Sequence, residues 1–308
     1  MALSLHPEAH ACGKVILLGE HAVVYGQPAL AAGLPGSLAL QATPLSDRLA
    51  PIELRIPAWD VDLRLEPAQD HPVARACLEV LSFCDGPITG WSIEGRTTLP
   101  ARAGLGSSAA LTVAVARLAL GADAPAEPVV EASMAGERIF HGEPSGIDSE
   151  VAARGGLVRY VRGQPVEPIP LAAPLPLVLV PSRVPRSTAD QVAKVRARHD
   201  RLPMITRPLL ELFGRAVTSA IESISANDLD QLGEIMNVVH HLLGALDVSS
   251  PILDELCSIA RAAGARGAKL TGAGGGGCIL ALPPADPALL LDAFRERGYE
   301  PLSVRLSP

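Results

Sequence analysis

Hydrophobic positions follow two different periods, and the period changes along the chain. Apolar and polar residues alternate over 52–56 (IELRI) and 61–65 (VDLRL), which predicts antiparallel strands with one solvated face. The apolar run 15–18 and the segments 91–97, 177–180 and 278–282 predict further strands. Helical spacing predicts helices at 71–83, 109–120, 127–140, 207–226, 228–246 and 250–263, with another ending near 298. The mixture predicts an α+β protein.

Prolines and glycines mark the breaks between these elements. Four prolines between 168 and 176 and a length of 308 residues favour two domains, which we place at 1–172 and 173–308. Gly142, Pro144 and Gly146 predict that the polar segment 141–156 contains no regular helix, so that Asp148 lies in a loop. Gly264 suits the position just after a helix end.

Composition narrows the classes of partner. The formal charge is −7, no basic run stands out and aromatic residues make up only 3%, so nucleic acid and anionic membranes are disfavoured as partners. Five scattered cysteines without a C-x-x-C spacing indicate neither a zinc site nor a disulfide framework. The first residues lack a basic segment followed by an apolar stretch, so we expect a cytoplasmic protein without a membrane partner.

Two glycine-rich segments predict an anion site. The first, 100–120 (PARAGLGSSAALTVAVARLAL), runs from Gly104 and Gly106 through Ser107 and Ser108 into an apolar helix, whose unpaired N–H groups attract a phosphate. The second, 269–280 (KLTGAGGGGCIL), has five glycines between 272 and 277. We expect the two segments to hold a phosphate-bearing ligand between two domains.

Two other readings of the first segment stay open as alternatives. Its G-x-G-x-x-A spacing fits a dinucleotide-binding fingerprint, but Pro100 and Arg102 separate it from the nearest predicted strand. The G-x-S-x-A spacing around Ser108 resembles a nucleophile elbow, although no histidine is placed by sequence to serve it. A dinucleotide oxidoreductase and a serine hydrolase are therefore the weaker hypotheses.

Polar residues near the two segments have the chemistry of phosphoryl transfer. A kinase without a P-loop needs magnesium ligands, a cation against the transferring charge and a base for the attacking hydroxyl. Ser108 and Glu137 suit the metal, Lys14 suits the cation and Asp148 suits the base.

The order of these motifs resembles the GHMP kinases. The segments that carry the resemblance are KVILLGEHAVVYG (14–26), PARAGLGSSAA (100–110) and KLTGAGGGGC (269–278). Within that superfamily, GEHAVVYG, HGEPSGIDSEV, VPRST and MNVVHHLLGALDVSSPILDEL are most similar to the mevalonate kinases, and the match spans essentially the whole chain.

The resemblance implies a role for each candidate residue. Asp148 would be the general base for the C5 hydroxyl of mevalonate and Lys14 its charge partner, while Ser108 and Glu137 would hold Mg²⁺ on ATP. Residues expected to bind the nucleotide are Ala103, Gly104, Leu105, Gly106, Ser107, Ser108, Gly274 and Gly275. Residues expected to contact mevalonate are Glu20, His21 and Thr188.

The resemblance also implies a two-domain GHMP kinase fold, ribosomal-protein-like in its N-terminal domain and ferredoxin-like in its C-terminal domain. It implies ATP and Mg²⁺ as cofactors, a place in isoprenoid synthesis and a homodimer. Arg102 and Ser149 depart from the family pattern, which commonly has glycine and asparagine there. A GHMP kinase for a related acid or sugar, and a non-catalytic nucleotide-binding regulator, stay open as alternatives.

Overall fold

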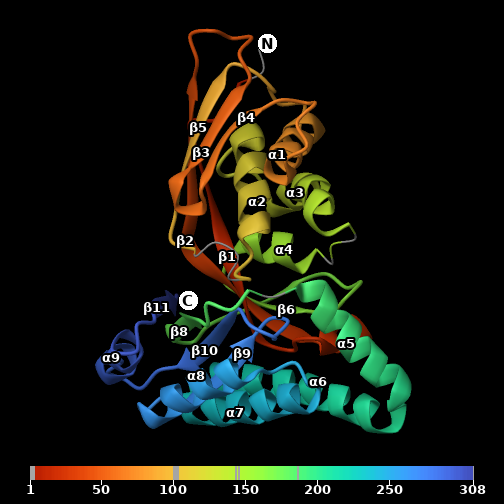
Figure 1. Cartoon of the computed structure of the whole chain (residues 1–308), viewed down its shortest axis with the longest axis vertical. Coiled ribbons are helices and arrows are strands. Elements are labelled where there is room, and N and C mark those ends of the chain that lie inside the picture. Colours follow the sequence, from red (N-terminus) through yellow and green to blue (C-terminus); the bar gives the residue numbers. More distant parts are fainter. Residues whose placement is uncertain (1–3, 100–103, 143, 145, 186, 308) are drawn as a thin grey trace. The chain divides into compact units, whose positions relative to one another are not determined.

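The computed structural model describes all residues except 1–3, 100–103, 143, 145, 186 and 308 (Figure 1). Contacts divide the chain into two compact units. Unit 1 contains the described residues of 1–14, 33–101 and 105–155, and unit 2 contains those of 15–32, 102–104 and 156–308. Strands β1 (Glu8–Leu18) and β2 (Ala29–Pro44) contribute residues to both units. The domain boundary after residue 172 stays a prediction.

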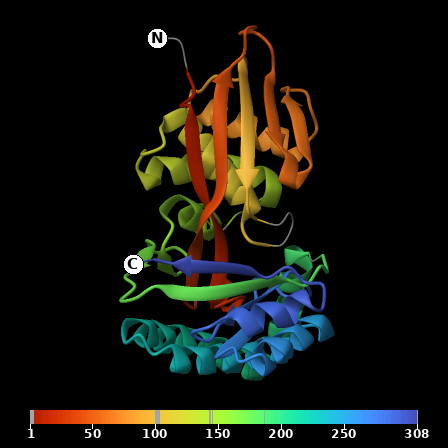
Figure 2. The ribbon, with the colours of Figure 1, turned by 90° about the vertical axis from the view of Figure 1, so that its left-hand side faces the viewer.

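Unit 1 consists of strands with helices on one face (Figures 1 and 2). Its further elements are β3 (Ile52–Ile56), the 3-10 turn η2 (Pro57–Trp59), β4 (Val61–Leu65), α1 (Pro72–Phe83), β5 (Trp91–Thr97), α2 (Ser107–Leu120), α3 (Ala126–His141) and α4 (Ile147–Arg154). Strand β3 pairs antiparallel with β4 and parallel with β5, and β5 pairs antiparallel with β2. Every residue from Ala109 to Ala116 is buried, so α2 forms the centre of this unit.

Unit 2 contains an antiparallel four-stranded sheet in the order β11-β8-β10-β9, with helices α6 to α8 beside it (Figure 1). Its elements are η1 (Ala22–Tyr25), β6 (Leu157–Tyr160), β7 (Glu167–Ile169), β8 (Leu175–Pro181), α5 (Thr188–Arg201), α6 (Pro203–Ser225), α7 (Leu229–Ala245), α8 (Pro251–Ala262), β9 (Gly267–Thr271), β10 (Cys278–Leu282), α9 (Ala288–Arg295) and β11 (Leu302–Leu306). All residues of β9 and β10 are buried, because β10 lies between β8 and β9, and helices α7 and α8 pack against β9.

One predicted feature is wrong. Asp148 does not lie in a loop: it is in the first turn of α4. Gly146 adopts a left-handed conformation (φ 85°) that begins this helix, and the sequence IDSEVAAR after it contains no glycine or proline. The helix-breaking residues therefore stop just before Asp148, and the eight residues after Gly146 suffice for two turns.

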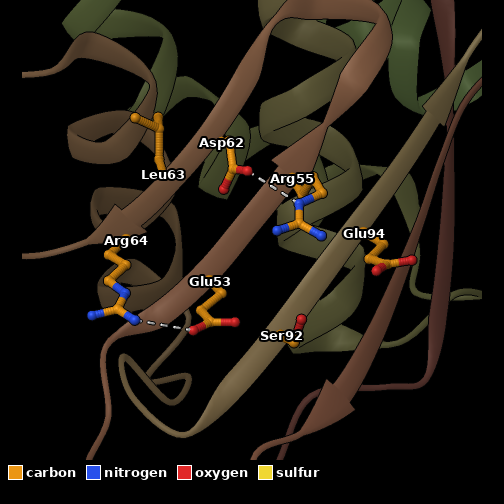
Figure 3. Close-up of a pocket in the computed structure, with 7 residues that line it drawn as sticks. All are labelled: Glu53, Arg55, Asp62, Leu63, Arg64, Ser92 and Glu94. Atoms are coloured by element: carbon orange, nitrogen blue, oxygen red, sulfur yellow. Dashed lines mark hydrogen bonds and ion pairs between the residues drawn. The ribbon is translucent and has the colours of Figure 1, made fainter.

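The uncovered face of the unit 1 sheet carries a pocket of about 360 Å³ (Figure 3). Its lining residues are Glu53, Arg55, Asp62, Leu63, Arg64, Ser92 and Glu94. Cross-strand ion pairs join Arg55 to Asp62 and Arg64 to Glu53 (Figure 3). Because these charges neutralise each other on exposed strands, we assign no chemistry to this pocket.

Candidate functional site

An ion pair in unit 1 joins two of the predicted site residues. The Nζ of Lys14, on β1, is 2.9 Å from Oδ1 of Asp148. The Asp148 side chain is 33% exposed and that of Lys14 only 10%, so the carboxylate is the more accessible partner. Its place in the first turn of α4 favours negative charge through the helix dipole. The pair is thus an accessible carboxylate beside a fixed cation.

Glu137, on α3, is a buried carboxylate close to this pair. Its Oε2 accepts a hydrogen bond of 3.4 Å from Ser108 Oγ, whereas its Oε1 is buried without a hydrogen-bond partner. Burial, reinforced by the charge of Asp148, raises the pKa of Glu137 to about 7, against the smaller lowering effects of Ser108 and Lys14. Among the described residues, no lysine or arginine forms an ion pair with it. Its charge is therefore left largely unbalanced.

His141 is a neighbour that the sequence reasoning missed. Its Nε2 lies 3.2 Å from Ser108 Oγ and 3.7 Å from Glu137 Oε2. The i,i+4 spacing of Glu137 and His141 on one helix is the signal that could have found it. Because both contacts use the same ring nitrogen, the carboxylate does not orient the histidine through its other nitrogen, as a hydrolase triad requires.

The first glycine-rich loop is tied to the strand that carries Lys14. The backbone N–H of Lys14 donates to the carbonyl of Leu105 (2.7 Å). Gly106 has φ 74°, and a Cβ on it would lie 3.0 Å from the Cβ of Lys14, so glycine permits this close approach. Helix α2 begins at Ser107 without a side-chain cap, which leaves N–H groups of its first turn for a ligand. The predicted nucleotide contact Ala103, like Arg102, lies outside the described residues.

Arg117 fixes α4 against β1. Its guanidinium donates 2.6 Å hydrogen bonds to the carbonyl of His10, on β1, and to that of Ala153, at the end of α4. Lys14 lies four residues after His10 and Asp148 five residues before Ala153. One side chain of α2 thus connects the two elements that carry the ion pair.

Unit 2 contains a different ion pair, between Glu20 and Lys269. Both side chains are buried, at 1% and 0% exposure, and the Nζ of Lys269 contacts Glu20 Oε1 directly. Lys269 also donates to its neighbouring carbonyl, that of Leu270 (2.7 Å). Burial raises the pKa of Glu20, while Lys269 acts in the opposite direction. This pair joins the GEH segment to the strand that precedes the second glycine-rich loop.

The second glycine-rich loop is packed closely within unit 2. His21 Nε2 lies 2.9 Å from the carbonyl of Ala273, which brings a predicted substrate residue to this loop. The N–H of Gly275 donates to the carbonyl of Val248 (2.8 Å), and a Cβ on Gly274 would lie only 2.0 Å from the same oxygen. The loop requires glycine at this point because the backbone of Val248 leaves no room for a side chain.

Thr188 is exposed at the first position of α5. Ser187 caps this helix by accepting a hydrogen bond from the N–H of Asp190.

The structure gathers Lys14, Ser108, Glu137 and Asp148 in unit 1, and Glu20, His21 and the second glycine-rich loop in unit 2. Within the described residues, no helix is long and apolar enough to cross a membrane.

Comparison with known proteins identifies the family. The model of the GHMP kinases N terminal domain matches residues 72–156, and that of the GHMP kinases C terminal region matches residues 220–300. The mevalonate kinase of Pyrococcus horikoshii is 37% identical over 97% of this chain and 95% of its own length. That of Aeropyrum pernix is 36% identical over 89% of this chain and 87% of its own.

Solved structures agree with this assignment. The L. major mevalonate kinase, determined in complex with R-mevalonate, superposes with a TM-score of 0.85 and 27% identity, covering 98% of this chain and 96% of the other. The Methanococcus jannaschii mevalonate kinase also gives a TM-score of 0.85, at 22% identity, and supports the fold. The predicted two-domain GHMP kinase fold is confirmed, and ATP as a substrate follows from the family. This chain belongs to the GHMP kinases, and within them to the mevalonate kinase family.

Proposed function

We propose that this protein transfers the γ-phosphoryl group of ATP to the C5 hydroxyl of mevalonate, giving 5-phosphomevalonate and ADP in isoprenoid precursor synthesis. The observation that carries the proposal is the Lys14–Asp148 pair, with Glu137 and Ser108 beside it, on the elements that contain the family motifs. Relatives named mevalonate kinase, 35% to 37% identical over nearly the whole chain, support the choice of substrate.

Asp148 acts as the general base in this proposal. Its carboxylate takes the proton of the C5 hydroxyl as that oxygen attacks the γ-phosphorus, and the bond to the β,γ-bridging oxygen breaks to release ADP. Lys14, 2.9 Å away, holds the carboxylate in place through the ion pair and stabilises the negative charge that develops on the attacking oxygen.

The residues around Glu137 fit a magnesium ion. Glu137 Oε1 is buried without a partner, and the hydroxyl of Ser108 lies beside the other carboxylate oxygen. Mg²⁺ usually takes only one or two protein carboxylates and completes its shell with water and substrate phosphates. The described residues contain no cluster of three or more acidic, histidine or cysteine ligands. When bound there, Mg²⁺ would neutralise charge on the β- and γ-phosphates.

The remaining assignments complete the proposal. Backbone N–H groups from Ala103 to Ser108 would hold the phosphates, and Gly274 and Gly275 would contribute from the second glycine-rich loop. Glu20, His21 and Thr188 are assigned to the mevalonate pocket. A cytoplasmic location and a homodimer are also proposed. Fractionation of the host cell and sedimentation of the purified protein test those two statements.

Replacing Asp148 by asparagine tests the base directly. Asp148→Asn keeps the shape of the side chain but cannot take a proton, so turnover should fall by roughly 10²- to 10⁴-fold while ATP still binds. Mevalonate-dependent ADP release and nucleotide binding are measured on the same samples. Glu150→Gln is a matched control, because Glu150 is an ion-paired acid on the same helix, 2.7 Å from Arg154. Near-normal turnover of Asp148→Asn would exclude Asp148 as the base.

A further inference from the structure

Three buried hydroxyl groups connect helices α2, α3 and α4 inside unit 1. Thr112 Oγ1 lies 2.8 Å from Ser133 Oγ, and Ser133 Oγ lies 2.9 Å from Ser149 Oγ. The three residues are 0%, 0% and 1% exposed. Such a chain of hydrogen bonds in an apolar interior is stronger than the same bonds in water, because water does not compete for the donors.

Each hydroxyl lies at a fixed short offset from a proposed active-site residue. Thr112 is one helical turn after Ser108 on α2, and Ser133 is one turn before Glu137 on α3. Ser149 directly follows Asp148 on α4. The chain of hydroxyls therefore joins the three helices that carry the base and the two candidate metal ligands.

The hydrogen atoms of this chain can all be placed in one direction. Thr112 Oγ1 donates into the first turn of α2, where the carbonyls of Ser108 and Ala109 are both 3.2 Å away. In this arrangement Ser133 donates to Thr112 and Ser149 to Ser133, since either hydroxyl of each pair can be the donor. The chain of hydrogen bonds therefore ends on the backbone of the helical turn that contains Ser108. Every hydroxyl has a donor role, so none of the three hydrogens is left unpaired in the core.

Close packing around the chain limits how far the helices can move. A Cβ on Gly136, next to Glu137, would lie 2.6 Å from Thr112 Cγ2. Glycine at this position lets α3 approach α2 closely enough for Ser133 to reach Thr112. The hydroxyl chain and this contact thus fix the same pair of helices.

We propose that Thr112, Ser133 and Ser149 are positioning residues that hold Ser108, Glu137 and Asp148 in register for phosphoryl transfer. The inference rests on the proposed function. Ser149, the departure from the asparagine that is common in the family, becomes one end of this chain. None of the three hydroxyls touches substrate in this account; they act through the helices that carry the reacting groups.

Removing the central hydroxyl tests the proposal. Ser133→Ala should lower kcat by roughly 10- to 100-fold, because small displacements of reacting groups are costly, while KM for ATP and for mevalonate changes less than about threefold. Ser223→Ala is the matched control. Ser223 is equally buried, on α6 of unit 2, and its hydroxyl is within hydrogen-bond distance of the carbonyl of Ser219 (2.8 Å) and of Gln231 Oε1 (2.7 Å). This control should lose similar stability but keep kcat within about twofold of the parent.

Two further variants keep the test decisive if Ser133→Ala folds poorly. Thr112→Val keeps the shape of the side chain without the hydroxyl, whereas Thr112→Ser keeps the hydroxyl without the methyl group. We expect Thr112→Ser to retain most of kcat and Thr112→Val to lose it. Equal kcat in these two variants, or a Ser133→Ala rate equal to that of Ser223→Ala, would overturn the positioning role. A parent without mevalonate turnover would instead contradict the proposed function, so the two failures are distinct.

Discussion

Glu20 and Glu137 are equally buried glutamates, each 1% exposed, in different units of the molecule. Glu20 has its own cation, because Lys269 is buried with it and contacts it directly. Glu137 has a serine hydroxyl at 3.4 Å and a histidine nitrogen at 3.7 Å but no such cation, and each glutamate keeps one buried carboxylate oxygen without a hydrogen-bond partner. A buried charge requires compensation. Glu20 receives it from the protein, whereas Glu137 is arranged to receive it from a ligand cation.

The causes of the pKa shifts of Glu20 and Glu137 differ in the same way. Burial raises the pKa of both. Around Glu137, the negative charge of Asp148 adds to burial and the pKa reaches about 7. Around Glu20, the main opposing influence is the positive charge of Lys269. The unit 1 carboxylate therefore carries a cost in the free chain that a bound metal would remove.

Breaking the ion pair between Glu20 and Lys269 should have the largest effect on stability. Lys269→Met leaves Glu20 buried without its cation and should lower the free energy of unfolding by about 3–5 kcal/mol. Glu20→Gln combined with Lys269→Met should recover most of that loss, because both charges are removed together. Denaturant titration of the two single variants and the double variant measures this cycle. Additive losses would show that the two side chains do not act as a pair.

Neutralising Glu137 should change the free energy of unfolding in the opposite direction. The folded chain keeps the Glu137 proton up to about pH 7 whereas the unfolded chain releases it near 4.5, so unfolding free energy falls as pH rises through this window. Without metal, Glu137→Gln should therefore be more stable than the parent by up to roughly 3 kcal/mol at about pH 8, and equal to it below about pH 4.5. Its turnover should fall by about 10²-fold or more. If Glu137→Gln were less stable than the parent at about pH 8, the charge of Glu137 could not be unbalanced in the folded chain.

His240, next to the strand that carries Lys269, allows a test of how stability depends on pH. Its Nδ1 accepts from the N–H of Leu270 and its Nε2 lies 3.2 Å from Asp254 Oδ1. Burial, only partly offset by Asp254, lowers its pKa to about 4, so folding stability is lost as pH falls from about 6.5 to 4. The loss of unfolding free energy caused by His240 reaches roughly 2–3 kcal/mol at about pH 4. The difference in unfolding free energy between parent and His240→Gln should change over this window, and a constant difference would refute it.

The exposed pairs of the unit 1 sheet should have the smallest effect. Arg55 and Asp62 are 60% and 75% exposed, with 3.2 Å between Arg55 Nε and Asp62 Oδ2 (Figure 3). Arg55→Ala should change the unfolding free energy by less than about 1 kcal/mol, and less still at high salt. Thermal unfolding at two salt concentrations measures this. A loss comparable to that of Lys269→Met would mean that burial does not explain the difference between the pairs.

Much of the fold was predictable because its periods are visible in the sequence. The alternating runs at 52–56 and 61–65 form the antiparallel pair β3–β4, and the helical spacing of 71–83 corresponds to α1. Helix α5 was not predicted, since Val195 is its one buried residue and no apolar stripe marks it. Strand β2 was missed because Gly33, Pro35 and Gly36 interrupt it.

The residues of the candidate site could be proposed from the sequence, but the partners that they contact could not. The motifs pointed to Lys14, Ser108, Glu137 and Asp148, which the structure places in one unit. The contact of Lys269 with Glu20 spans 249 positions and has no local sequence signal. The hydrogen bonds among Thr112, Ser133 and Ser149 could not be predicted either, because the sequence does not distinguish a buried helical serine or threonine from other core residues.

The most direct test of the account is the substrate preference of the parent protein. ADP release with MgATP is measured against mevalonate, phosphomevalonate, homoserine and galactose under identical conditions. The account predicts a strong preference for mevalonate. Turnover of another compound in its place, or no turnover of any while ATP still binds, would contradict it.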